Sequence, residues 1–318
     1  MHIFRWDLDR TYLDTDIFSV RGMLRAAVES PESKRNIPGA DVLLRALLRQ
    51  DPEDRATILS GSPTQMRAAL EQKLTLDGIR FDSLVLKDNL RNLRKGRLRA
   101  LKGQLGYKLP RLLELRLGDP VDSTESLFGD DAEVDAVIYA LYADVLAGEV
   151  TRGALIDVMK AGGAYPDQID DALGSVDRLT RRDAVTDIWI HVDRGIPLTH
   201  FAMLGPRVRV VFSWFQAALG LWSRGRLTDD DVTAVAHRVA QTGGYGVLAV
   251  SSWAQDAVRR GLAPGPQVRS LLARTGDLQG LAPHAVAAID RLGNWSGAST
   301  QPPQRDYIGF LRASETFV

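Results

Sequence analysis

The sequence has no cysteine among its 318 residues. Disulfides, thiolate zinc sites and a cysteine nucleophile are therefore excluded, and the composition is compatible with a reducing compartment. Net charge is absent as well, because 40 Lys and Arg residues balance 40 Asp and Glu residues. This balance gives no reason to expect nucleic acid as a partner of the whole chain.

Long apolar runs are also missing. The nearest candidate for a membrane span, around residues 198–222, is interrupted by Arg207 and Arg209, so no transmembrane segment is predicted. Near the N-terminus, Arg5 and Asp7 interrupt the apolar stretch that a secretory signal peptide would need. We therefore expect a cytoplasmic protein.

What remains is an ordinary globular composition, 45% hydrophobic and 25% charged, in a chain long enough for two domains. The first part alternates strand and helix patterns. Strands are predicted at residues 2–8, 55–63, 81–89 and 124–131, and helices at 18–30, 40–50, 64–78, 108–118 and 132–148. Such alternation predicts a Rossmann-like α/β fold, with a parallel sheet and helices on both faces.

The pattern changes after about residue 150. Helices are predicted there almost throughout, including 206–225 and 282–295, with one short strand at 184–193. We therefore predict an α/β domain over 1–150 and a mainly helical C-terminal domain over 151–318. The sequence assigns no role to the second domain.

Polar residues follow the apolar part of three predicted strands. Asp7 and Asp9 follow the first, Ser60 the second, and Asp130 with Asp131 the fourth. In parallel sheets ligands bind outside the carboxyl ends of the strands, so these three clusters should meet at one edge. Taken singly, each cluster is also typical of a turn or a capped helix.

Five stretches occur in an order that carries more information than any one of them. They are DLDRT (7–11), SGSPTQM (60–66), LKDN (86–89), YKLPRLLEL (107–115) and FGDDAEVDAVIYALY (128–142). Together they resemble the motifs of the haloacid dehalogenase superfamily of phosphatases, and most closely those of the phosphatidate phosphatase catalytic-domain family of the actin-patch type. The resemblance covers roughly residues 1–150 and implies a haloacid dehalogenase-like fold with hydrolysis of phosphomonoesters.

The resemblance implies catalytic roles for four residues. Asp7 would be the nucleophile that forms an aspartyl-phosphate, and Asp9 the acid that protonates the leaving oxygen and then activates water. Ser60 would hydrogen-bond the transferring phosphoryl oxygens. Lys108 would hold the phosphoryl group, although Lys87 is an open alternative because a charge clamp alone does not distinguish them.

The resemblance also implies a cation site and a substrate-binding surface. The expected cation is Mg²⁺, a hard ion that takes oxygen ligands, and such a cation would offset the cost of placing carboxylates close together in a buried site. The expected ligands are Asp7, the backbone carbonyl of Asp9, and Asp130. Asp135 corresponds to the last acidic position of the pattern. Asp131 is either a direct ligand or a residue that contacts a ligand. The remaining substrate-binding candidates are Thr11, Gly61, Ser62 and Lys87. Pro63 suits the first turn of a following helix, so the SGSP amides could face an anion.

The substrate class stays open. Arg10 and Asp131 depart from the lipid-phosphatase pattern, and no insertion near the motifs is large enough for a lid, which favours a bulky substrate such as a phosphatidate-like lipid. Residues 87–116 carry ten basic and two acidic side chains, which fits either an anionic membrane surface or a solvated helix face. The aromatic stretch around Trp214 is typical of a core helix, with an interfacial helix as the alternative. A phosphate-binding or scaffold protein, whose helical half recruits a partner, is the alternative to an enzyme.

Overall fold

One parallel sheet organises the chain. The computed structural model describes residues 1–15, 30–87, 103–132, 134–192, 195–242, 245–274 and 305–314. Its six strands lie in the order β3-β2-β1-β4-β5-β6, and every neighbouring pair is parallel. They are β1 (His2–Asp7), β2 (Arg55–Pro63), β3 (Ser83–Lys87), β4 (Thr124–Asp130), β5 (Val185–His191) and β6 (Val208–Val211). The predicted α/β Rossmann-like architecture is thus confirmed at this level.

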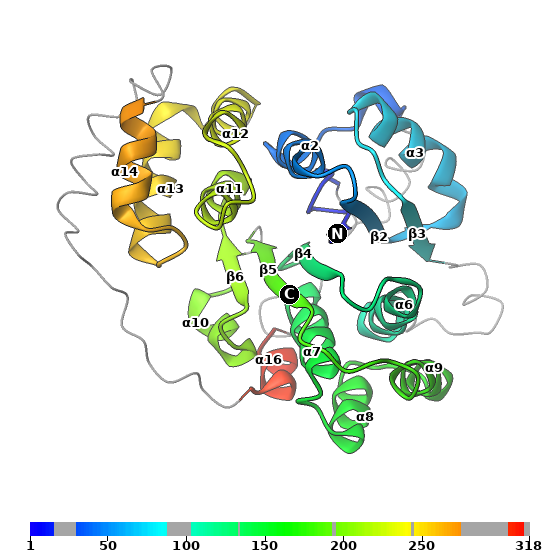
Figure 1. Ribbon diagram of the computed structural model, residues 1–318. Helices are drawn as coiled ribbons and strands as arrows, with labels where there is room; N and C mark the ends of the chain where they lie inside the picture. Colours follow the sequence, from blue (N-terminus) through cyan, green and yellow to red (C-terminus); the bar gives the residue numbers. More distant parts are fainter. Residues whose placement is uncertain are drawn as a thin grey trace.

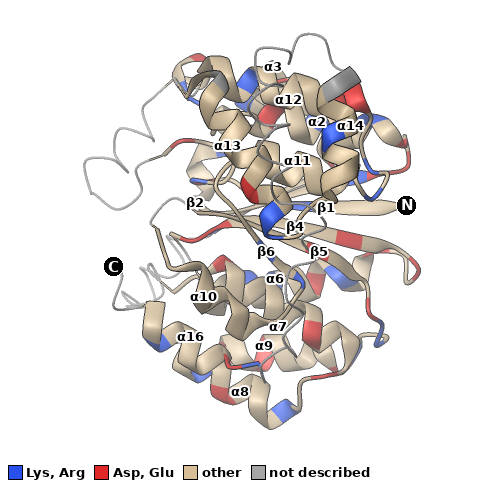
Figure 2. Cartoon of the chain, turned by 90° about the vertical axis from the view of Figure 1, so that its left-hand side faces the viewer, with Lys and Arg blue, Asp and Glu red and all other residues tan. Residues whose placement is uncertain are grey.

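Helices cover both faces of the sheet (Figures 1 and 2). On one face lie α2 (Ala40–Gln50), α3 (Arg67–Leu76), α11 (Trp214–Trp222), α12 (Asp229–Thr242), α13 (Gly246–Arg259) and α14 (Gly265–Arg274). On the other lie α6 (Leu105–Gly118), α7 (Asp135–Ala147), α8 (Arg152–Ala161), α9 (Pro166–Val176), α10 (Leu198–Phe201) and α16 (Tyr307–Ser314). Three short 3₁₀ segments complete the described elements: η1 (Pro31–Ser33), η2 (Thr64–Met66) and η3 (Ala202–Leu204).

The central position of β1 follows from its sequence. All six of its residues are buried, as expected for a strand of a parallel sheet that is covered on both faces. Successive side chains alternate between the faces. Phe4 and Trp6 belong to the apolar core beneath α2 and α11, so Arg5 and Asp7 project toward the opposite layer. The nucleophile candidate is therefore held at the end of a rigid central strand.

The second half of the chain completes this same sheet. Both β5 and β6 come from residues beyond 150, and β5 pairs with β4 along its length. The apolar core on the α2 face also joins Trp6 to Trp214 and Val235. The described residues therefore do not separate into an α/β unit ending at 150 and a helical unit after it, because the strands of both parts share one hydrogen-bonded sheet.

One predicted helix is corrected. Residues 206–225 form β6 and then α11, and the helix begins only after Ser213, whose hydroxyl accepts a hydrogen bond from the Phe215 amide. A serine cap of this kind marks a helix start, and the strand before it is only four residues long. Trp214 and Phe215 are completely buried, so the interpretation of this stretch as core is confirmed.

Several predictions fall outside the described residues. These are the helices predicted at 18–30 and 282–295, apart from Ser30, and residues 88–102 of the basic stretch. Within the rest of that stretch, Arg111 pairs with Glu114 and Arg116 is buried.

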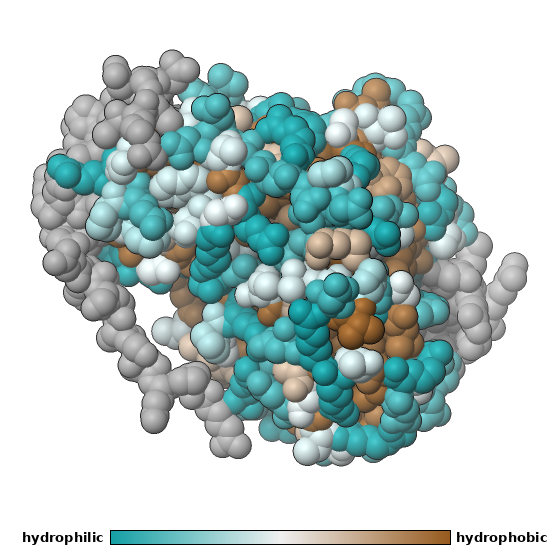
Figure 3. Space-filling view, in the orientation of Figure 1, coloured by the Kyte–Doolittle hydropathy of each residue, from teal (hydrophilic) through white to brown (hydrophobic). Residues whose placement is uncertain are grey.

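None of the helices in the described ranges is long and apolar enough to cross a bilayer. The face shown in Figure 3 is mostly hydrophilic, with apolar residues in small separate groups.

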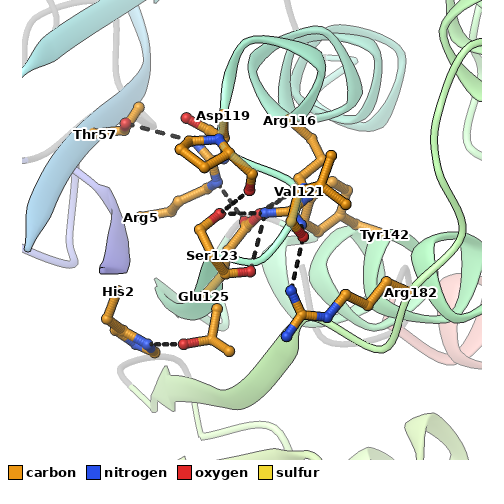
Figure 4. A network of polar contacts seen from close by, with 12 residues as sticks. His2, Arg5, Thr57, Arg116, Asp119, Val121, Ser123, Glu125, Tyr142 and Arg182 are labelled. Carbon is orange, nitrogen blue, oxygen red and sulfur yellow. Dashed lines mark hydrogen bonds and ion pairs between the residues drawn. The ribbon is translucent and has the colours of Figure 1, made fainter.

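A buried polar network ties the sheet to the helices of the α6 and α7 layer (Figure 4). Glu125 of β4, completely buried, accepts hydrogen bonds from Arg5 Nε at 2.6 Å, from Arg116 Nη1 at 3.1 Å, and from the Tyr142 hydroxyl at 2.9 Å. Arg5 also pairs with Asp119, just after α6. Charge-assisted bonds of this type are directional, so the network fixes α6 and α7 relative to β1 and β4.

Candidate functional site

Three buried carboxylates meet at the carboxyl edge of the sheet. Asp7 ends β1, Asp130 ends the neighbouring β4, and Asp135 begins α7. One oxygen atom of each lies within 4.8 Å of the others, and all three residues are completely buried. This grouping is what the strand-end rule predicted for Asp7 and Asp130.

Lys108 lies inside this group. Its Nζ donates to Oδ1 of Asp7 and to Oδ1 of Asp135, at 2.6 Å in both cases. The lysine is itself completely buried, and it comes from the first turn of α6, where its amide bonds the Gln104 carbonyl. A buried ammonium group requires such partners because desolvation of an unpaired charge is very costly.

The two lysines that the sequence left open are now distinguished by position. Lys108 touches the candidate nucleophile Asp7, whereas Lys87, at the end of β3, donates to the carbonyl of Gly103 at 3.2 Å. The Lys87 ammonium also lies 5.4 Å from the centre of the Tyr107 ring. Lys108 is therefore the lysine placed to neutralise charge at Asp7.

Asp135 is packed tightly against β4. A β-carbon at Gly129 would lie 2.6 Å from Oδ2 of Asp135 and 2.7 Å from Cε2 of Tyr139, so only glycine allows α7 to approach this closely. Burial raises the pKa of the Asp135 carboxyl, and the Lys108 ammonium acts in the opposite direction. Gly129 lies within the FGDD stretch, but its role has no local signal in the sequence because it depends on the packing of the following helix.

Asp9 has a different environment from the three carboxylates. Its Oδ1 accepts a hydrogen bond from Thr15 Oγ1 at 2.9 Å, and its Oδ2 accepts from Ser60 Oγ at 2.9 Å and Ser62 Oγ at 2.8 Å. The Ser60 hydroxyl, which we expected on phosphoryl oxygens, thus points to Asp9 in this structure. Thr15 was not predicted, since nothing in its sequence spacing indicates that the loop returns to Asp9.

The hydroxyls of Thr15, Ser60 and Ser62 form a hydroxyl cage around Asp9. The loop after β1 connects this cage to the three clustered carboxylates. Arg10 has a φ of 61°, the one positive φ of a non-glycine residue in the described part of the chain. Its amide donates to the Leu13 carbonyl at 2.7 Å, and the next residue, Thr11, donates its hydroxyl to Oδ2 of Asp130 at 3.1 Å. Thr11 therefore orients a carboxylate here.

The segment after β2 differs from the prediction. The strand continues through Pro63 and is followed by η2, so α3 starts only at Arg67. The expectation that Pro63 begins the helix and aims the SGSP amides at an anion is therefore wrong in that form. A β-carbon at Gly61 would lie 2.6 Å from Nε2 of Gln104, which shows that the Gly61 backbone packs directly on this side chain.

Residues of the second half also reach the site. His191 ends β5 beside Asp130, and its ring stacks on Trp214 at a centroid distance of 5.5 Å. Burial lowers the pKa of His191 to about 4, so the ring is neutral at pH 7. Asp131 lies outside the group of three carboxylates, and its Oδ2 accepts a hydrogen bond from the Ile196 amide at 3.3 Å. His191 and Ile196, the two residues from the second half, belong to no motif of the sequence.

The donor set fits a hard divalent cation. Carboxylate oxygens are the ligands that Mg²⁺ prefers, and Asp7, Asp130 and Asp135 supply them from three separate elements. In addition, Oδ2 of Asp135 is buried and accepts no hydrogen bond from any residue in the described ranges. A buried carboxylate oxygen without a hydrogen bond is explained if it serves as a ligand.

No protein-family model, no curated protein and no solved structure matches this chain.

Proposed function

We propose that this protein is a Mg²⁺-dependent phosphomonoester hydrolase of the haloacid dehalogenase type. The observation that carries the proposal is the contact between Asp7 and Lys108 inside the group formed with Asp130 and Asp135, all four completely buried at the carboxyl edge of the sheet. Burying four charged side chains lowers the stability of the fold because each loses its hydration. This loss is explained if the side chains serve a reaction in which negative charge develops and must be neutralised.

Asp7 is the nucleophile in this proposal. An oxygen of its carboxylate attacks phosphorus, the P–O bond to the leaving group breaks, and an aspartyl-phosphate forms. Lys108, which already donates to Asp7 Oδ1 at 2.6 Å, neutralises charge on that carboxylate and on the transferring phosphoryl group. Asp7 lies at the end of a fully buried strand, so its position needs little reorganisation.

Asp9 is the acid and base. It gives a proton to the leaving oxygen and later takes one from the water that attacks phosphorus, which releases Asp7 and inorganic phosphate. The three hydroxyls around Asp9 hold its carboxyl group in place. Because hydroxyl groups both donate and accept, this cage accommodates the carboxylate and the protonated form alike.

A divalent cation held by Asp7, Asp130 and Asp135 would stabilise charge that develops on phosphorus when it is bound. Thr11 keeps Asp130 in orientation for that role through its hydrogen bond. Asp131, which bonds to the Ile196 amide, is in our proposal a neighbour of the ligands that positions the chain after β4.

A bulky, lipid-like phosphomonoester is the substrate class that we propose to test first. Its support is the basic composition of residues 87–116 and the absence of a large insertion near the motifs. A peripheral contact with an anionic membrane would follow from the same basic stretch.

The test is hydrolysis of a phosphomonoester panel that includes short-chain phosphatidate and an aryl phosphate, with Mg²⁺ and after chelation. Wild type is compared with Asp7→Asn and with Asp14→Asn, which changes an exposed carboxylate in the loop after β1. We expect turnover that needs Mg²⁺, is abolished in Asp7→Asn and is retained in Asp14→Asn. Absence of turnover on every substrate by a folded, cation-binding protein would favour the phosphate-binding or scaffold alternative.

A further inference from the structure

The position of Lys108 has a consequence for cation binding at the proposed site. Its single ammonium group bonds Oδ1 of Asp7 and Oδ1 of Asp135 at the same time. Both carboxylates belong to the group of three that could hold a cation. Lys108 therefore occupies oxygen atoms on two of the three ligands.

The charges of the group explain why it does so. With all three carboxyl groups ionised, three negative charges and one ammonium leave two negative charges among these four side chains, three minus one. All four are completely buried, where like charges repel strongly and solvent screens them little. In the metal-free protein Lys108 reduces the repulsion between Asp7 and Asp135.

A divalent cation that enters the group meets Lys108 as a competitor. It needs carboxylate oxygens, and it carries two positive charges into a buried space that already holds an ammonium group bonded to those carboxylates. The second oxygen of Asp135 accepts no hydrogen bond from the described residues, so one ligand atom is available before Lys108 moves. Oδ1 of Asp7 and Oδ1 of Asp135 each lie 2.6 Å from the ammonium, so a cation bound to either of these oxygens lies close to Lys108.

We propose that Lys108 is the resident counter-ion of the metal-free site and that it opposes divalent cation binding, so that a bound cation weakens its ion pairs with Asp7 and Asp135. This inference depends on the cation site of the proposed function, and it assigns Lys108 a second role besides holding the phosphoryl group. One side chain would then couple the two events, because a cation that loosens Lys108 from Asp7 leaves its ammonium available to the incoming phosphoryl group.

Calorimetric titration with MgCl₂ or MnCl₂ at pH 8 tests the proposal on wild type, Lys108→Met, Lys108→Gln and Lys108→Arg. Removing the charge should lower the cation dissociation constant by about tenfold or more in the Met and Gln variants, since a buried like charge near the cation is lost. The Arg variant keeps the charge and should bind no more tightly than wild type. Lys73→Met is the matched control, because Lys73 is a buried lysine paired with Asp77 outside the site.

A second measurement covers the case in which the uncharged variants fail to fold. In wild-type protein labelled with ¹⁵N-lysine, the Lys108 ammonium resonance should shift on saturation with Mg²⁺, while that of Lys73 should not. Equal or weaker cation binding by folded Lys108→Met and Lys108→Gln would overturn the proposal, as would an unchanged Lys108 resonance at saturation. If Lys108→Met binds a cation and wild type does not, the proposal is supported. If neither protein binds a cation, the proposal is overturned.

These outcomes are independent of turnover. Every Lys108 variant is expected to lose phosphatase activity if the proposed function is correct, whichever way cation affinity changes. If cation affinity responds to the Lys108 charge but wild type hydrolyses no substrate, the phosphatase proposal is refuted and the counter-ion role of Lys108 is kept.

Discussion

Trp214 donates its indole N–H to the backbone carbonyl of Thr11 at 3.0 Å, across 203 positions of sequence. The ring of Trp214 also lies 5.1 Å from that of Trp6 on β1. A helix of the second half thereby fixes the loop whose Thr11 hydroxyl orients Asp130. The second half of the chain is therefore part of the site's support.

Replacement of Trp214 by Phe tests this support. The change keeps most of the buried ring and leaves the Thr11 carbonyl without its donor, so we expect a loss of about 1–3 kcal/mol in unfolding free energy. Cation affinity or kcat should fall as well, because the loop that carries Thr11 is less constrained. Trp222→Phe is the control, since the Trp222 indole donates to Asp229 at 2.8 Å away from the site. Equal activity losses in both variants would contradict the prediction.

The hydroxyl cage predicts how Asp9 variants depend on the leaving group. An alkyl phosphate needs its leaving oxygen protonated, so Asp9→Asn should reduce its turnover by about 10²–10⁴-fold. An aryl phosphate with an acidic leaving group should lose much less. Thr15→Val, which removes one hydroxyl donor to Asp9, should show the same trend more weakly, and Thr15→Ser should remain close to wild type. A loss that is the same for both substrates would argue against an acid role.

Substitution of Glu125 should lower the unfolding free energy far more than substitution of an exposed residue of an ion pair. In Glu125→Gln the buried guanidinium groups of Arg5 and Arg116 lose their shared carboxylate. Breaking a buried pair in this way costs about 3–5 kcal/mol, which urea unfolding would measure.

The matched control is Asp177→Asn, which breaks the exposed pair between Arg152 and Asp177 at 2.8 Å. Exposed pairs contribute only about 0–1 kcal/mol. Similar losses for the buried and the exposed substitution would show that the network of Glu125 has little energetic importance.

His2 makes stability depend on pH. Its Nδ1 lies 3.1 Å from Arg226 Nη2 and its Nε2 lies 2.9 Å from Ser126 Oγ. Because arginine can only donate, Nδ1 is the acceptor and Nε2 carries the proton. Burial, together with the nearby Arg226 charge, lowers the pKa of His2 to about 3.

The sign of the effect follows from the lowered pKa. The unfolded chain takes up this proton near pH 6.5 and the folded chain only near pH 3, so protonation favours unfolding between these values. The contribution of neutral His2 is complete above pH 6.5 and declines by about 1.4 kcal/mol per pH unit as the pH falls. The difference in unfolding free energy between wild type and His2→Gln should therefore shrink from pH 6 to pH 4. A difference that stays constant over this range would disprove the assignment.

The elements that sequence reasoning located correctly are those whose pattern is local. The strands β1, β2 and β4 are apolar segments bounded by turn residues, and their shared edge follows from parallel pairing. The strand β6 was missed because its four residues run directly into the apolar stretch of α11. A short strand and a buried helix cannot be separated by hydrophobicity alone.

Within the site, residue types were predictable and their contacts were not. The sequence left Lys108 and Lys87 open as the lysine that holds the phosphoryl group, and only the direction of α6 shows that Lys108 bonds Asp7, while Lys87 donates to the Gly103 carbonyl. The place of Asp131 outside the carboxylate group depends on Ile196, which belongs to a part of the chain without any motif. Such contacts are set by tertiary packing.

The central place of β1 also bears on how the protein is made. The strand precedes both of its partners in the chain, since its pairing begins at Arg55 on one side and at Thr124 on the other. Contacts between distant residues form slowly because a long loop must close first. During synthesis, β1 would leave the ribosome well before β4 and long before Trp214. The strand that carries Asp7 therefore emerges before β4 and before Trp214, and in that interval its apolar side chains are open to chaperones.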